Sequence, residues 1–77
     1  GVFFGERRFL VAMSNDLAAT SCGDSLLFWD LNCRIMIRQV RIYGSIDKLL
    51  RLNSRSVLCC SGSNFYRVDV PTIRFTQ

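Results

Sequence analysis

The sequence of 77 residues predicts an all-β protein made of two antiparallel four-stranded units. The first observation is a gapless internal repeat at a spacing of thirty-nine residues. Its matched positions include Gly23 with Gly62, Trp29 with Val68, and Asp30 with Asp69. The second observation is that short apolar runs alternate with turn-forming residues, while no helical stripe lasts three turns. A period of this length built from strand-like runs predicts one sheet for each copy.

In the first copy, four strands are expected in residues 8–13, 17–21, 26–31 and 34–42. Turn chemistry separates them, at Ser14-Asn15-Asp16, Gly23-Asp24-Ser25 and Asn32-Cys33. The order of strand and tight turn predicts a meander. Residues 1–5 are expected to be the tail of a strand from a preceding copy.

In the second copy, strands are expected in residues 46–52, 56–61, 65–70 and 72–76. Pro71 is expected at a strand entrance, because proline donates no hydrogen bond to a ladder. Residues 46–52 also fit one or two helical turns, since Ile46, Leu49 and Leu50 fall at helical spacing. The matching segment 7–13 alternates, so we predict a strand here too.

Length and composition indicate that the chain needs a neighbour. A chain of 77 residues with 49% hydrophobic residues forms one small core, and such chains are marginally stable without a staple or a partner. The mean hydropathy of +0.21 is high for so small a protein. We therefore expect that other polypeptide covers part of its apolar surface.

Charge and cysteine content favour a soluble, intracellular protein. Ten basic against six acidic residues give a net charge of +4, scattered along the chain instead of clustered in a basic arm. No apolar run reaches membrane-span length, and the first residues lack a signal-peptide pattern. Cys22, Cys33, Cys59 and Cys60 are expected to be reduced and to pack as small hydrophobes, although a Cys22–Cys60 bridge remains an alternative.

The residues that usually carry catalysis or bind metals are sparse. The chain has no histidine, and Cys59 and Cys60 should point to opposite faces of a strand, which disfavours a shared metal ion. Asp24, Asp30 and Asp69 fall at turns or strand ends, where carboxylates commonly accept backbone hydrogen bonds. We therefore expect no enzyme, no cofactor and no metal site.

Residues 23–32, GDSLLFWDLN, resemble the third strand of a WD-repeat β-propeller blade, where a Trp-Asp pair follows an alternating apolar strand. The preceding LAATS resembles the small-residue second strand, and SVLCCSGSNFYRVDV occupies the matching places in the second copy. The resemblance implies a fragment of a larger β-propeller, with blade one at about 6–42 and blade two at about 45–77. It also implies that the histidine-centred hydrogen-bond network of that family is missing, so that packing holds the blades.

The resemblance implies a non-enzymatic scaffold for protein–protein interaction within a larger intracellular assembly, whose partners include the remaining blades of the same propeller. Trp29 is expected in the core. The alternative is contact with RNA or DNA through an arginine-rich outer strand next to an aromatic residue. The residues expected to contact partners are Arg34, Arg38, Tyr43 and Arg51.

Overall fold

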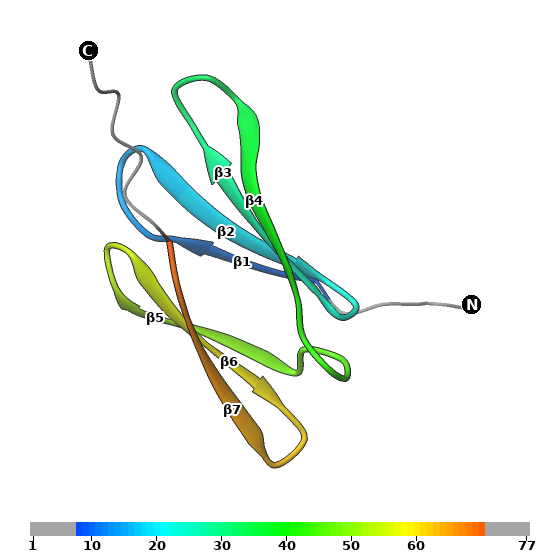
Figure 1. Ribbon diagram of the computed structural model, residues 1–77. Coiled ribbons are helices and arrows are strands. Elements are labelled where there is room, and N and C mark those ends of the chain that lie inside the picture. Colours follow the sequence, from blue (N-terminus) through cyan, green and yellow to red (C-terminus); the bar gives the residue numbers. More distant parts are fainter. Residues whose placement is uncertain (1–7, 71–77) are drawn as a thin grey trace.

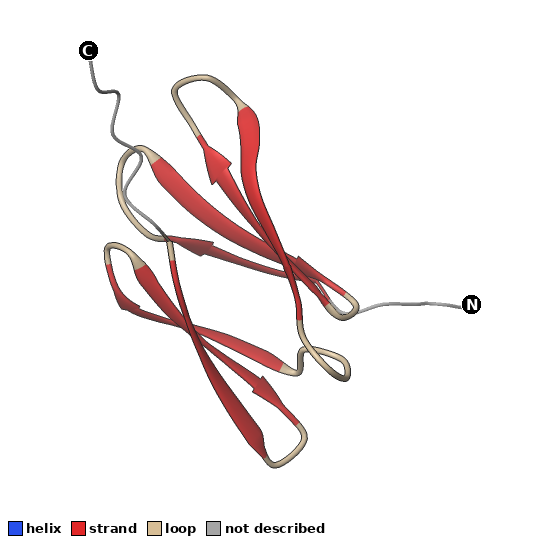
Figure 2. Cartoon of the chain, in the orientation of Figure 1, coloured by secondary structure: helices blue, strands red, loops and turns tan. Residues whose placement is uncertain are grey.

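The computed structural model describes residues 8–70, which form two antiparallel β-sheets with no helix (Figures 1 and 2). Sheet A has the order β1-β2-β3-β4 and sheet B the order β5-β6-β7. The strands are β1 Arg8–Ala12, β2 Leu17–Cys22, β3 Ser25–Asp30, β4 Ile35–Arg41, β5 Lys48–Asn53, β6 Ser56–Ser61 and β7 Asn64–Asp69. The predicted all-β class is thereby confirmed.

The two sheets follow the internal repeat. Strands β2 and β6 begin and end thirty-nine residues apart, and so do β3 and β7. Their two-residue hairpin loops begin with Gly23 and Gly62, both at φ 61°. Residues with a side chain rarely adopt this backbone conformation, so glycine is favoured at the same place in each copy.

The segment that fitted either a helix or a strand is a strand. Strand β5 pairs antiparallel with β6 from Lys48 to Asn53, with a register shift between Arg51 and Asn53. The fourth strand expected in residues 72–76 and the tail expected in 1–5 lie outside the described residues. Within residues 8–70, sheet B therefore has three strands where sheet A has four.

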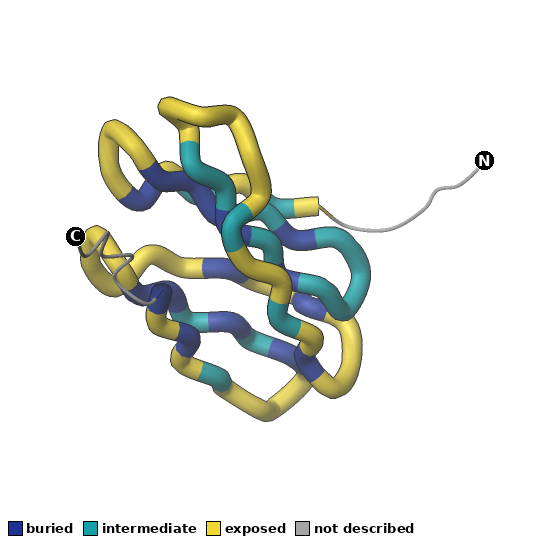
Figure 3. Tube along the Cα trace, turned by 45° about the horizontal axis from the view of Figure 1, so that its top comes forward, coloured by how far each residue is buried: buried dark blue, intermediate teal, exposed yellow. Residues whose placement is uncertain are grey.

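The hydrophobic core lies between the two sheets, and Figure 3 shows the buried segments in the middle of both layers. The tips of the β3–β4, β5–β6 and β6–β7 hairpins are exposed. Residue pairing assigns alternate positions to this layer, because directly opposed residues in an antiparallel ladder point to the same side. Its largest fully buried side chains are Phe28, Met13, Leu26, Ile46, Val57 and Cys59. Burial of these side chains is the main favourable term in the packing of one sheet on the other.

The connection from β4 to β5 is anchored to both hairpins. The Ile42 amide donates to the Asp24 carbonyl, and the Ile46 amide donates to the Gly23 carbonyl. Asp47 then bonds to the second hairpin, because its amide donates to the Cys60 carbonyl. Ile42 and Ile46 are buried, so the connection covers one edge of the core.

Candidate interaction surface

Two of the four predicted contact residues, Arg38 and Arg51, link the sheets. Arg38 on β4 donates from Nη1 to the Asp69 carbonyl of β7 at 2.9 Å. Arg51 on β5 donates from Nε to the Met13 carbonyl at 3.0 Å. A hydrogen bond from a charged guanidinium to a backbone carbonyl helps to hold the two layers together.

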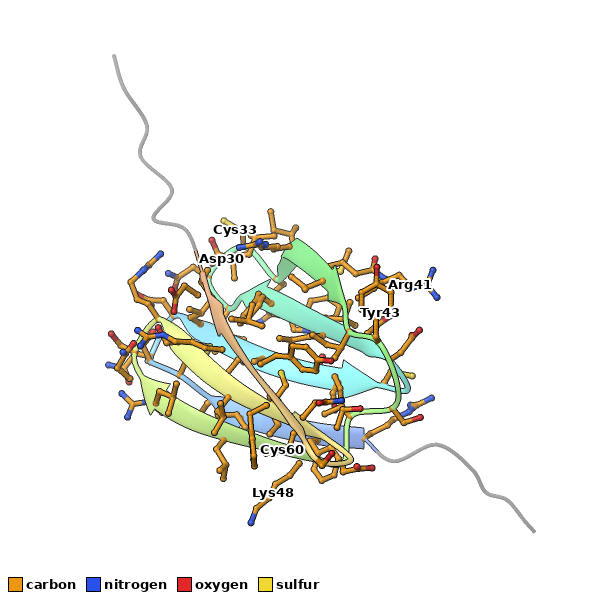
Figure 4. All side chains as sticks on the ribbon, turned by 60° about the horizontal axis from the view of Figure 1, so that its bottom comes forward. Asp30, Cys33, Arg41, Tyr43, Lys48 and Cys60 are labelled. Atoms are coloured by element: carbon orange, nitrogen blue, oxygen red, sulfur yellow. The ribbon has the colours of Figure 1, made fainter. Side chains whose placement is uncertain are left out.

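The other two, Arg34 and Tyr43, lie at opposite ends of β4. Arg34 is in the β3–β4 turn with φ 60°, and its amide donates to the Asp30 carbonyl. Tyr43 follows β4 and is 90% exposed. A seven-residue strand spans roughly 20 Å, so the structure does not bring the four residues into one site. Figure 4 shows Arg41 and Tyr43 at one end of sheet A and Cys33 at the other.

Tyr43 borders a depression of about 440 Å³ at the sheet end, which is also lined by Asp24, Arg41, Ile42 and Gly44. Arg41 Nη2 and Asp24 Oδ2 form an ion pair at 3.0 Å. The hydrogen bond from Arg41 and its positive charge lower the pKa of the Asp24 carboxyl. Both side chains are well exposed, so this pair contributes little to stability.

A larger apolar surface lies on the side of sheet A that faces away from sheet B, which we name the outer face of sheet A. The pairing of β1, β2, β3 and β4 assigns it Arg8, Leu10, Ala12, Ala18, Thr20, Cys22, Ser25, Leu27, Trp29, Met36, Gln39 and Arg41. It holds a depression of about 490 Å³ lined by Arg8, Phe9, Leu10, Thr20, Ser21, Cys22, Leu27 and Trp29. The sequence predicted that apolar surface is left for a neighbour to cover, but none of the four predicted contact residues lies on this face, although alternation along β1 and β3 carries the signal.

Trp29 lies on this outer face, so its predicted place in the core is wrong. The neighbouring Phe28 occupies the core instead and is fully buried, whereas Trp29 is half-buried. The indole Nε1 of Trp29 donates to Thr20 Oγ1 at 2.8 Å. Adjacent strand residues point to opposite sides, so only one of the two rings can face sheet B.

The corresponding outer face of sheet B is more polar. Pairing of β5, β6 and β7 assigns it Lys48, Leu50, Ser56, Leu58, Cys60, Phe65, Arg67 and Asp69. Lys48 and Cys60 lie on the side away from sheet A (Figure 4). The hydrogen bond from Ser56 Oγ, followed by that from Arg67 Nε, lowers the pKa of the Asp69 carboxyl.

The four cysteines lie within the described residues and form no disulfide. Cys22 is on the outer face of sheet A and Cys60 on that of sheet B, so both sheets separate them within one chain. Cys59 is buried, and this burial together with the neighbouring Cys60 raises the pKa of its thiol to about 11. A thiol with so high a pKa is a poor nucleophile at neutral pH.

Within residues 8–70, no three histidine, cysteine, aspartate or glutamate side chains are grouped so as to hold a metal ion. The same residues contain no helix that is long and apolar enough to cross a membrane. Comparison with protein-family models, curated proteins and solved structures finds no match to this chain.

Proposed function

We propose that this chain is a non-enzymatic protein-interaction module, built as two consecutive blades of a WD-repeat-like β-propeller. The observation that carries the proposal is the uncovered apolar outer face of sheet A, where Leu10, Leu27 and Trp29 surround a depression. Apolar surface of this kind, bordered by polar residues, is typical of protein–protein contact sites.

The relation between the two sheets supports the propeller interpretation. The copies match in strand bounds and in turn glycines, yet they pack through different sides of the repeat. Leu17 and Ala19 of β2 face sheet B, whereas the residues that match them, Ser56 and Leu58, face away from sheet A. A radial array of repeated blades requires this arrangement, because each blade presents one side to the blade before it and the other to the blade after it.

Nucleic-acid binding has less support. Of the arginines on which it depends, Arg38 donates to the Asp69 carbonyl of the opposite sheet, and Arg41 forms an ion pair with Asp24. Arg34 and Tyr43 lie at opposite ends of β4, so they form no continuous track for a phosphate backbone.

The chain has no histidine to bond the tryptophan, but Trp29 donates a hydrogen bond to Thr20, so packing is not the sole support of the indole ring.

Affinity capture from cell extract, with and without nuclease treatment, tests the interaction role. The wild-type chain is compared with Leu10→Arg, which charges the outer face of sheet A, and with Ile35→Arg. Ile35 is also exposed but pairs with Asp30 on the opposite side of sheet A, which makes its variant a matched control. Proteins captured by wild type and Ile35→Arg but lost with Leu10→Arg support the proposal. Capture that nuclease abolishes, or that Leu10→Arg leaves unchanged, contradicts it.

A further inference from the structure

Each sheet exposes the side of the repeat that the other sheet buries in the core. Leu10 on the outer face of sheet A is 73% exposed, while its match in the repeat, Leu49, is 6% exposed against sheet A. Likewise, Trp29 is half-buried and open to the outer side, while its match Val68 belongs to the core. The outer face of sheet A is therefore a second copy of the surface that sheet B uses to pack on sheet A.

The reverse relation holds on the other side of the molecule. Phe65 on the outer face of sheet B is 68% exposed, while its match Leu26 is fully buried in the core. Leu58 on the same face is only partly buried, while its match Ala19 is fully buried in the core. The outer face of sheet B thus repeats the surface through which sheet A packs on sheet B.

We propose that a second copy of this chain docks head to tail, with the outer face of its sheet B packed on the outer face of sheet A. This rests on the proposed role as an interaction module and names its partner. The contact continues the packing already present within the chain, since each half has a buried counterpart there. Such an interface is heterologous, because the two copies contribute different surfaces.

The side chains at the proposed contact suit burial. Leu10, Leu27 and Trp29 on one copy would meet Leu50 and Phe65 on the other. The depression of about 490 Å³ between Leu10, Leu27 and Trp29 would receive the phenyl ring of Phe65.

Two charged residues on the outer face of sheet B break the repeat pattern: Lys48 stands where the first copy has Phe9, and Arg67 stands where it has Phe28. The Arg67 guanidinium is already paired with Asp69, with Nε at 3.0 Å from Oδ1, while its methylene stem can cover apolar surface. Arg67 therefore enters the contact with its charge neutralised at the strand end.

Sedimentation equilibrium of wild type, Leu10→Arg and Phe65→Arg tests the proposal, with circular dichroism to establish that each variant is folded. Each single variant should weaken self-association by about tenfold or more, whereas Ile35→Arg should leave it unchanged. An equimolar mixture of the two variants should form dimers again, because one copy retains an intact outer face of sheet A and the other an intact outer face of sheet B. The proposal would be overturned if one variant abolished association, the other left it unchanged, and mixing did not restore it. That result would indicate that identical faces pair with each other.

A second measurement is crosslinking of the Cys33→Ser variant, in which both outer faces keep their natural residues. A short bis-maleimide should join Cys22 of one copy to Cys60 of another, and peptide mapping of the dimer band identifies the linked pair. Cys22–Cys22 or Cys60–Cys60 links alone, or a chain that stays monomeric at its highest soluble concentration, would refute head-to-tail docking. The proposed function survives that result if capture of other proteins still depends on Leu10, and it fails separately if capture does not.

Discussion

Sheet A and sheet B share one repeat but bury opposite sides of it. Leu26 is fully buried while its match Phe65 is exposed, and Leu49 is buried while its match Leu10 is exposed. The residue types at these places are equally apolar, so local sequence does not explain the difference. The comparison shows that a strand with two apolar sides has its burial decided by which side has a neighbour.

The aspartates that end β3 and β7 also differ in what they bind. Asp30 Oδ1 accepts hydrogen bonds from the amides of Asn32 and Cys33, which shapes the β3–β4 turn. Asp69 instead binds the Ser56 hydroxyl and the Arg67 guanidinium of its own sheet. Matching positions in a repeat can therefore share a residue type and differ in role.

The largest expected loss of stability follows from removing a core side chain of sheet A. Phe28→Ala should destabilise the fold by about 3–5 kcal/mol, as loss of a buried aromatic ring usually does. Trp29→Ala should cost less, about 1–2 kcal/mol, because the indole is half-buried on the outer face. Urea unfolding followed by circular dichroism measures both. Equal losses would mean that the two rings share the core.

The hairpin glycines sharpen the comparison at the next level. Gly23→Val should cost about 1–3 kcal/mol, because a β-branched residue is strained at φ 61°. Gly62→Ala should cost about 1 kcal/mol from the same backbone conformation alone, since a Cβ at this position meets no atom within 4 Å. Thermal unfolding of the two variants gives the order. A neutral Gly23→Val would show that this turn tolerates another conformation.

The arginines that join the sheets should matter more than the one in a turn. Arg38→Ala and Arg51→Ala each remove a hydrogen bond to a carbonyl of the opposite sheet and should cost about 1 kcal/mol. Arg34→Ala, at an exposed turn, serves as the control for loss of charge and should change stability less. Chemical denaturation of the three single variants tests this, and equal values for all three would mean that the hydrogen bonds of Arg38 and Arg51 do not stabilise the fold.

The last effects concern the dependence of stability on pH. The pKa values of Asp24 and Asp69 lie below the ordinary 3.8, so their stabilising ionised forms are lost only as the pH falls below about that value. The pKa of Cys59 is raised from 9.0 to about 11, so the unfolded chain loses this proton first, and stability should fall between those pH values. Denaturation midpoints across the pH range measure both limbs. Cys59→Ala should flatten the alkaline limb, and an unchanged slope would place that titration elsewhere.

The repeat, the turn glycines and the strand-like alternation were sufficient to predict two antiparallel sheets from sequence. Gly23 and Gly62 take the same φ because a two-residue hairpin imposes that conformation locally. A strand in the predicted segment 46–52 was also predictable, since the match of this segment in the first copy alternates, and β5 covers Lys48–Asn53. Contact residues were less predictable, because the sequence pattern around an arginine on a strand is the same in two cases. The guanidinium can be solvated, or it can bind a carbonyl of another sheet, as that of Arg38 does.

What the sequence by itself determined is the set of strands, their turns and their alternation, because these depend on backbone preferences and on residues close in the chain. Only the tertiary structure decided which side of each sheet is covered. Phe28 and Trp29 are both aromatic neighbours on β3, and period-two alternation places them on opposite sides without saying which side meets sheet B. That choice depends on the β4–β5 connection, which brings sheet B over the side that carries Phe28 and leaves Trp29 on the outer face.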